Sequence, residues 1–317
     1  MKSGSDLVAP FTADGAACGV SASGAMTCWG ADYGTVATRP PTAGAAVASG
    51  FQNVCTLDGA GRIRCLGSPL YGVTAPPAGT GFSHLGVGVL SACAIDATGA
   101  IACWGDPADG KTAPPAGTGW KDLAVGNVHA CAIAADDSIA CWGRNDGGDT
   151  AVPAGAYRDV SAGSGVTCAV RLDNTLGCWG IPFDDVTAAP AGNDYVRLWG
   201  REGTTCAEHA GGGLACWGYN ATDLPAAGLT FSSVAIGASA CTTNASHTLV
   251  CGQNSCGVGA DGGLTCWGTL GLARFAPPTG HDFVGVSAGD LFMCATSSGG
   301  AVECWGSLVR PRAIDVP

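Results

Sequence analysis

Apolar and polar residues alternate over short stretches of the chain, and pairs of such stretches are separated by turns that contain Gly. The segment from Cys93 to Cys103 is the simplest example, because two apolar runs flank a loop at residues 97–99. Alternation with a period of two is typical of half-buried strands, and a Gly-containing loop of three residues is typical of a hairpin. With Cys93 opposite Cys103, Ile95 lies opposite Ile101 on the buried face, and the Gly takes the left-handed position that ends the loop.

A further strand is expected before each hairpin, as in residues 120–125, where apolar and polar residues again alternate. This gives three to four strands for each unit of the chain. No segment of useful length shows the period of 3.6 residues that is typical of an amphipathic helix. The pattern therefore predicts an all-β protein.

The chain has 18 cysteines, which form nine pairs whose members are always ten residues apart. The pairs are Cys18/Cys28, Cys55/Cys65, Cys93/Cys103, Cys131/Cys141, Cys168/Cys178, Cys206/Cys216, Cys241/Cys251, Cys256/Cys266 and Cys294/Cys304. Chance does not produce nine equal spacings, and neither Cys-x2-Cys nor a Cys/His cluster suited to zinc is present. We predict a disulfide within each pair; reduced cysteines packed in the core are the alternative.

Two more features recur with the cysteines, at a period of 37 or 38 residues over most of the chain. Seven second cysteines begin the tripeptide Cys-Trp-Gly, with tryptophans at Trp29, Trp104, Trp142, Trp179, Trp217, Trp267 and Trp305. A Gly stands five residues before the first cysteine at Gly50, Gly88, Gly126, Gly163 and Gly289. We expect each Trp to pack between neighbouring units; stacking against a ligand is the alternative. Short sheets at this period predict a β-propeller, and we count eight hairpin units plus the extra Cys241/Cys251 segment.

Residues 125–143, which include His129, resemble the repeat of the regulator of chromosome condensation family. The connector at residues 147–155 is similar to those of bacterial members of the family, which include a propeller-type β-lactamase inhibitor. The resemblance implies a propeller that usually has seven blades, whereas the hairpin count favours eight. We expect a single propeller domain over residues 1–317, with a 15-residue insertion around residues 241–256. The paired cysteines depart from the intracellular exchange factors of the family, and these repeats serve several unrelated functions.

Composition narrows the partners and the compartment. The chain has 14 Lys and Arg against 25 Asp and Glu, a net charge of −11, so a nucleic acid is not an expected partner. No run of about 18 apolar residues is present, so no membrane span is expected. Nine disulfides need an oxidising environment, which favours a secreted or cell-surface protein, although residues 1–6 contain no apolar signal segment. The acidic turns at residues 146–149 and 184–185 match no calcium loop, and we expect neither a metal nor a cofactor.

The sixth unit departs most from the repeat, and the fold does not explain such departures. Arg201 stands where five other units have Gly, Glu202 follows it, and Trp199 replaces a small residue. Glu208 occupies a core-facing position that is apolar in other units, and His209 follows it. A buried carboxylate needs a partner, and Arg201 is the candidate. These unusual residues either form a structural salt bridge or reflect a local register shift, or they form a site for a ligand or partner.

The segment between Cys241 and Cys256 is the second departure, and it carries His247 and Asn254. A disulfide-closed loop on a rigid scaffold is preorganised for recognition of a partner. The alternative is a duplicated hairpin that has drifted and has no role.

Three functions remain open. The first is an extracellular binding or adhesion propeller that engages a protein through the loops of one face. The second is a secreted inhibitor of an enzyme, and the third is a lectin or an enzyme that acts on glycans with Trp199, Glu202 and Glu208. We favour the first and expect no catalytic residue, because no nucleophile, phosphate-binding or metalloprotease motif is present.

Overall fold

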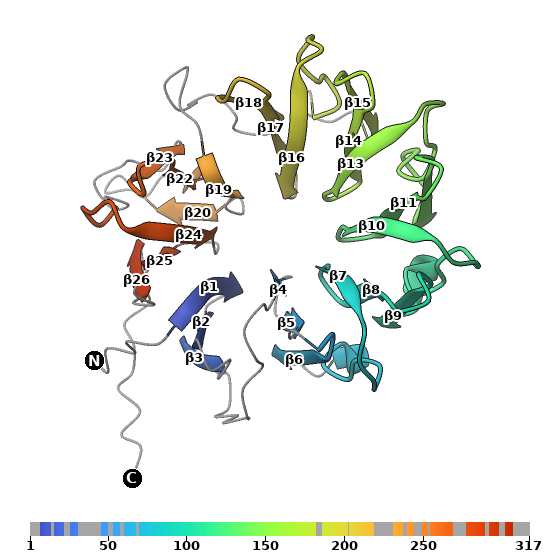
Figure 1. Ribbon diagram of the computed structural model, residues 1–317, viewed down its shortest axis with the longest axis horizontal. Helices are drawn as coiled ribbons and strands as arrows, with labels where there is room; N and C mark the ends of the chain where they lie inside the picture. The colour runs from blue at the N-terminus through green and yellow to red at the C-terminus, as the bar shows by residue number, and fades with distance from the viewer. Residues whose placement is uncertain are drawn as a thin grey trace. The chain divides into compact units, whose positions relative to one another are not determined.

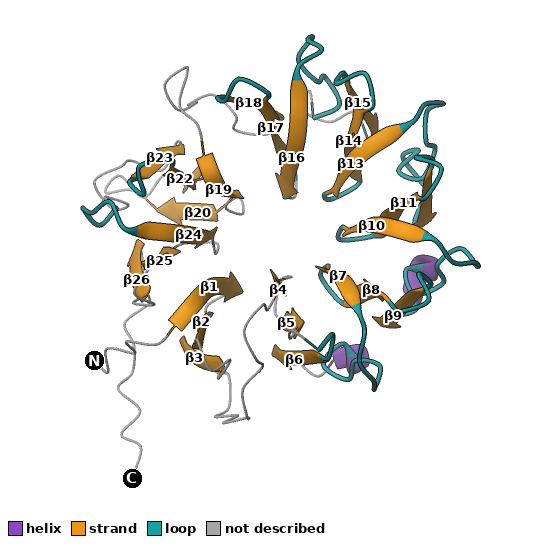
Figure 2. Cartoon of the chain, in the orientation of Figure 1, coloured by secondary structure: helices purple, strands orange, loops and turns teal. Residues whose placement is uncertain are grey.

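The computed structural model of the protein describes residues 7–13, 16–21, 26–30, 46–49, 53–57, 60–67, 70–181, 186–201, 203–218, 231–236, 240–243, 249–252, 254–268, 277–288, 292–297 and 302–306. The chain divides into two compact units, of which each is described by itself. One unit is Gly44–Phe231, and the other joins Met1–Ala43 to Ser232–Pro317. Strands account for nearly all of the regular structure (Figure 2).

The described residues of the unit Gly44–Phe231 form five antiparallel sheets of three strands, which follow one another in chain order (Figure 1). The sheets are β4 (Ala46–Ser49), β5 (Asn53–Leu57) and β6 (Ile63–Gly67); β7 (Ser83–Val87), β8 (Ser91–Ile95) and β9 (Ile101–Gly105); β10 (Trp120–Val125), β11 (His129–Ala134) and β12 (Ile139–Gly143); β13 (Tyr157–Ala162), β14 (Val166–Arg171) and β15 (Leu176–Gly180); and β16 (Tyr195–Arg201), β17 (Thr204–His209) and β18 (Leu214–Gly218). Two short 3-10 helices, η1 (Leu70–Gly72) and η2 (Ala108–Gly110), lie in the connectors.

The other unit contains three more three-stranded sheets and one two-stranded sheet among its described residues. The larger sheets are β1 (Leu7–Ala13), β2 (Ala16–Ser21) and β3 (Met26–Gly30); β19 (Phe231–Ile236), β22 (Asn254–Gly259) and β23 (Leu264–Gly268); and β24 (Phe283–Ala288), β25 (Phe292–Ser297) and β26 (Val302–Gly306). The small sheet, β20 (Ala240–Thr243) with β21 (Leu249–Gly252), lies between β19 and β22 in the chain. The eight three-stranded sheets of the described residues match the eight hairpin units counted in the sequence; the single domain with an insertion stays a prediction.

The predicted register of the hairpins is confirmed, because all nine cysteine pairs lie directly opposite each other on neighbouring strands. Six disulfides are defined within the described residues: Cys55–Cys65, Cys93–Cys103, Cys131–Cys141, Cys168–Cys178, Cys206–Cys216 and Cys256–Cys266. The first cysteine of each of these pairs is buried. These six disulfides therefore belong to the core, as the strand alternation predicted.

The other three predicted disulfides are not defined in the structure, because the side chains of their cysteines lie outside the described residues. They are the bridges that would join Cys18 to Cys28, Cys241 to Cys251 and Cys294 to Cys304. The backbone register of β2 with β3, of β20 with β21 and of β25 with β26 places the two members of each pair opposite each other. The six defined disulfides share this arrangement, but the bonds of Cys28, Cys251 and Cys304 stay predictions.

The hairpin loops also have the predicted geometry. Ile95 lies opposite Ile101, and Gly99 ends the loop with a φ of 79°. The same loop position has a φ of 68° in Asp137 and 65° in Asn174. The left-handed conformation is thus a property of the loop, and Asp and Asn tolerate it where Gly is absent.

Neighbouring sheets of the unit Gly44–Phe231 share their hydrophobic cores. In one core, Cys93 and Ile95 of one sheet pack with Leu123, Ala132 and Trp142 of the next. The same arrangement recurs between the other neighbouring sheets of this unit. Each sheet therefore buries its apolar face only by packing against the next one, as expected for a stacked repeat.

The predicted packing of the tryptophans between units is confirmed for the four whose side chains are described. Each is buried and donates its indole N–H to a connector carbonyl 30 or 31 residues earlier in the chain. The bonds are Trp104 to Val73 at 2.8 Å, Trp142 to Lys111 at 2.9 Å, Trp179 to Asp149 at 3.1 Å and Trp217 to Val186 at 3.1 Å. This bond joins the third strand of each sheet to the connector that precedes the first strand of the same sheet. It also satisfies a buried N–H donor.

The Gly that recurs five residues before the first cysteine permits close contact between sheets. A Cβ on Gly126 would lie 2.3 Å from the carbonyl oxygen of Gly163, which holds the same position in the next sheet. A Cβ on Gly88 would lie 2.1 Å from the carbonyl oxygen of Gly126. Gly88 and Gly126 are therefore required at their positions, because the neighbouring obstacle is backbone, which cannot move aside cheaply.

Gly126→Ala should lower the free energy of unfolding by about 1–3 kcal/mol, because the methyl group forces two sheets apart. The measurement is a urea denaturation curve under non-reducing conditions. The matched control is Gly211→Ala, since a Cβ at Gly211 meets no atom within 4 Å and its φ is not left-handed. Equal midpoints for the two variants would contradict this role for Gly126.

Candidate protein-binding surface

The first strands of four successive sheets each contain an irregularity near their start. The register shifts between Ser83 and Leu85, between Trp120 and Asp122, between Tyr157 and Asp159, and between Tyr195 and Arg197. Such a β-bulge leaves one residue unpaired and re-aims its side chain. In β7 the bulged residue is His84, whose φ of 44° is unusual for a residue with a side chain.

Three of these bulges surround an open depression of about 540 Å³. Its lining residues come from the sheets that begin with β7, β10 and β13: His84, Lys121, Asp122, Asp137, Arg158 and Leu172. Figure 1 shows these three first strands as neighbours in the unit. The depression is therefore built by the repeat itself, and its chemistry is set by residues that the repeat leaves free to vary.

The charged residues of the depression differ in whether a partner within the chain already compensates their charge. The Lys121 ammonium group forms an ion pair with the Asp137 carboxylate of the neighbouring hairpin loop. Burial raises the pKa of Asp122, although the Leu123 N–H donates a hydrogen bond to its carboxylate at 2.8 Å. Arg158 differs, because its guanidinium group donates to the Leu172 carbonyl at 2.7 Å and forms no ion pair among the described residues.

Leu172 is the residue of the depression that departs most clearly from the repeat. It begins a hairpin loop at a position where six other hairpins of the chain have Ala and two have Gly59 or Ser298. Its backbone N–H donates to the Ala156 carbonyl at 2.9 Å, while 44% of the residue is exposed. The fold is satisfied by Ala at this position, so the exposed leucine is not explained by packing.

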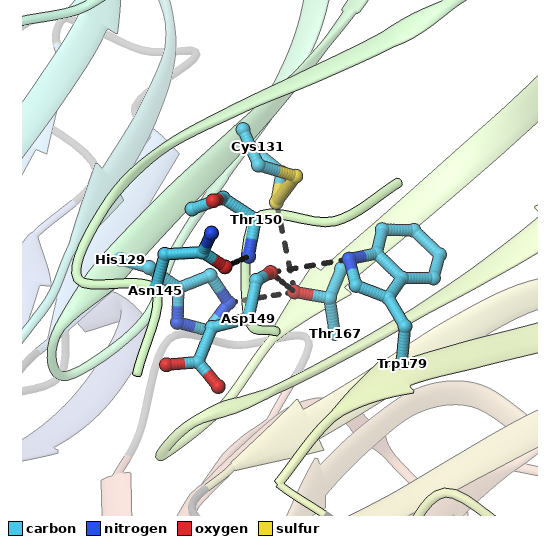
Figure 3. The surroundings of a disulfide bond; sticks show 8 residues. His129, Cys131, Asn145, Asp149, Thr150, Thr167 and Trp179 are labelled. Carbon is cyan, nitrogen blue, oxygen red and sulfur yellow. Dashed lines mark hydrogen bonds between the residues drawn. A yellow bond between two sulfur atoms is a disulfide. The ribbon is translucent and has the colours of Figure 1, made fainter. Parts of the chain in front are cut away.

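A second unusual cluster lies in the interior, around the Cys131 disulfide (Figure 3). His129 Nε2 lies 2.6 Å from the Thr167 hydroxyl, which also donates to the Asp149 carbonyl at 3.5 Å. Burial lowers the pKa of His129 to about 4, so the imidazole is neutral at physiological pH. His129 is thus a hydrogen-bonded core residue of the repeat.

Two connectors near this cluster each carry an ion pair at equivalent positions, but the acidic and the basic residue have exchanged places. After β9, Asp106 Oδ2 lies 2.7 Å from Lys111 Nζ, and this hydrogen bond lowers the pKa of Asp106. After β12, Arg144 and Asp149 hold the corresponding positions, with Nε and Oδ2 4.0 Å apart. The Asp149 side chain is fully buried, and its burial raises its pKa. The second pair is therefore less well compensated than the first.

The sixth unit brings together some of the residues singled out in the sequence. Glu208 is buried, as predicted, and its Oε2 accepts bonds from Arg197 Nε at 2.8 Å and from a terminal nitrogen of the same group at 2.7 Å. The Arg197 guanidinium carbon also lies 5.2 Å from the centre of the Trp199 ring. His209 has a different partner, because its Nδ1 lies 3.0 Å from an Asp194 carboxylate oxygen.

Arg201 was the expected partner of Glu208, and this expectation was wrong. The strand register places Arg197 opposite Glu208 and places Arg201 opposite Thr204, at the other end of the ladder. The bulge between Tyr195 and Arg197 sets this register, and nothing in the sequence marks it.

The other candidates cannot be placed in the same way. The side chains of Arg201 and Asn254 lie outside the described residues, although both residues belong to strands, β16 and β22. Glu202 and His247 lie outside the described residues altogether. Their proposed binding roles stay predictions.

Sequence reasoning missed a charged position that recurs beside the bulges. Asp122, Asp159 and Arg197 hold it in three successive sheets. Asp159 Oδ2 accepts a hydrogen bond from the Leu198 N–H at 2.7 Å and so links β13 to β16, and burial raises its pKa to about 7. Alignment of the repeats would have displayed the position, but not the contacts between sheets.

Within the described residues, no group of three or more His, Cys, Asp and Glu side chains is arranged to hold a metal ion. No helix in this part of the chain is long and apolar enough to cross a membrane.

The comparisons with known proteins concern the fold. No family model and no curated protein matches the sequence. The entire ectodomain of the receptor kinase CR4 from Physcomitrella patens is 22% identical, with a TM-score of 0.63, over 83% of this chain and 74% of that one. The CRINKLY WD40 ectodomain of the receptor kinase ACR4 from Arabidopsis thaliana is 18% identical, with a TM-score of 0.56, over 97% of each chain.

Yeast RCC1 (Prp20), in its complex with Kap60, is 15% identical, with a TM-score of 0.49, over 82% of this chain and 69% of that one. None of these likenesses bears on the β-lactamase inhibitor, whose resemblance stays a prediction. The likeness to the two plant ectodomains is a likeness of fold alone. The chain has an all-β propeller fold similar to that of the two plant ectodomains.

The contribution of the Arg144–Asp149 ion pair to the free energy of unfolding can be tested by comparison with the next connector. The connector after β15 has Ile181 and Val186 at the positions of Arg144 and Asp149. The double variant Arg144→Ile/Asp149→Val should therefore be as stable as the wild type or more stable. Arg144→Ile alone should lower the free energy of unfolding by about 1–3 kcal/mol, because it leaves the buried carboxylate without its cation.

Urea denaturation of the oxidised protein measures both effects. The single variant is the control for the double one, since both remove the same guanidinium group. A double variant that is as unstable as Arg144→Ile would show that the pair does more than neutralise Asp149.

Proposed function

We propose that the protein is an extracellular, non-catalytic propeller that binds another protein through the depression lined by Arg158 and Leu172. The observation that carries the proposal is the exposed Leu172 at a loop position where six other hairpins of the chain have Ala and the remaining two have Gly or Ser. Leu172 lies beside an arginine that has no carboxylate partner among the described residues. Arginine is enriched among the residues that dominate the binding energy of protein interfaces, and the exposed leucine beside it supplies apolar surface that a partner can bury.

A protein partner fits this surface better than a small molecule does. Small-molecule sites are concave, mostly apolar and largely enclosed. The depression is open to solvent, and most of its lining residues are ionisable. It extends over three neighbouring sheets, and a protein surface can cover such an area.

The extracellular location rests on the cysteines. Six disulfides are defined within the described residues, and the strand register places the three remaining pairs opposite each other. Structural disulfides persist in oxidising compartments and are rare in the cytosol. The protein is therefore proposed to meet its partner outside the cell or at the cell surface.

Photo-cross-linking tests the proposed surface. A photoreactive phenylalanine analogue placed at Leu172 should give a discrete cross-linked protein on cells that produce the chain. The expected product is suppressed by an excess of unlabelled wild-type protein and is not suppressed by an excess of Arg158→Glu.

The matched control carries the same analogue at Ala210, which holds the equivalent loop position in the next hairpin. It should give no such product, since the bulged residue beside it is Val196 instead of an arginine. Equal products from both positions, or none from Leu172, would overturn the proposed surface.

A further inference from the structure

The orientation of Arg158 indicates which group it can bind. One terminal nitrogen of the guanidinium group donates to the Leu172 carbonyl at 2.7 Å, and this bond holds the group beside the leucine. A guanidinium group has five N–H donors in a rigid fork, so several remain for another acceptor. The acceptor that matches this fork in charge and shape is a carboxylate.

The neighbouring charges support the same conclusion. The Lys121 charge is compensated by Asp137, and neither Asp122 nor Asp137 forms an ion pair with Arg158 among the described residues. Arg158 is therefore the cation of the depression whose charge is left for a partner, on a chain whose net charge is −11. An acidic group of a partner is attracted to this position and repelled by much of the remaining surface.

We propose that the depression recognises an extended acidic segment of the partner protein, in which a carboxylate and an apolar side chain lie on the same face. The carboxylate binds the Arg158 fork, and the apolar side chain packs on Leu172. In an extended segment, alternate residues point to the same side, so these two groups stand two residues apart. The inference deepens the proposed function and rests on it.

A synthetic peptide tests the chemistry of recognition without the natural partner. The probe is a fluorescein-labelled peptide in which the sequence Glu-Ser-Leu-Ser is repeated three times, and the readout is fluorescence anisotropy. We expect salt-sensitive binding to the wild type, with the dissociation constant raised about tenfold by Arg158→Glu and by Leu172→Ala. Arg158→Lys should bind with intermediate affinity, because it keeps the charge and loses the fork.

Two controls separate recognition from general attraction. A peptide with Lys in place of Glu should not bind the wild type. The variant Ala210→Leu adds a leucine to the equivalent loop where no bulged arginine adjoins, and it should leave the affinity for the Glu peptide unchanged. Leu172→Ala introduces the residue that most of the other loops have, so its fold is expected to be intact.

Failure of the acidic-segment inference is distinguishable from failure of the proposed function. No binding of the Glu peptide, or equal binding by Arg158→Glu, overturns the inference, even when cross-linking from Leu172 succeeds. A dimer of the chain that dissociates in Arg158→Glu also overturns it, because the occupant would then be a second copy. If cross-linking from Leu172 fails as well, the proposed surface falls with the inference.

Discussion

The disulfide between the second and third strand of a sheet is the constraint on which the rest of the structure depends. A sheet of three strands of four to seven residues buries its apolar face only against a neighbouring sheet, so it has little core of its own. A disulfide between cysteines ten residues apart contributes roughly 2–3 kcal/mol to stability, mainly by restricting the unfolded chain. Because the first cysteines of the six defined bridges are buried in the core, the bond also fixes which face of each sheet packs against its neighbour.

Packing between sheets then follows from two repeated features. The buried Trp donates to a connector carbonyl, and the recurrent Gly allows backbone to touch backbone. Both features stabilise the packing of one sheet against its neighbours more than the sheet itself. The stability of each sheet therefore depends on the sheets beside it. Residues that serve neither interface are free to change, and the surface chemistry of the depression comes from such residues.

Much of the fold follows from local rules that the sequence displays. The spacing of Cys93 and Cys103 and the place of Gly99 determine the hairpin, and the recurrence of Trp identifies the repeat. The partner of Glu208 could not be predicted, because it depends on a bulge that shifts the register by one residue. Leu172 departs from the Ala that most hairpins have at its position, but its contact with Arg158 joins a loop residue to a residue of β13 and appears only in three dimensions.

The most direct test of this account is the intact mass of the native protein after alkylation without reductant. The account predicts that no alkyl group is added and that the mass is 18 hydrogens below the reduced value, because six defined and three predicted bridges each remove two hydrogens. Alkylation of most cysteines would contradict it, since the sheets would then lack their cross-links and the argument for an extracellular location would fail.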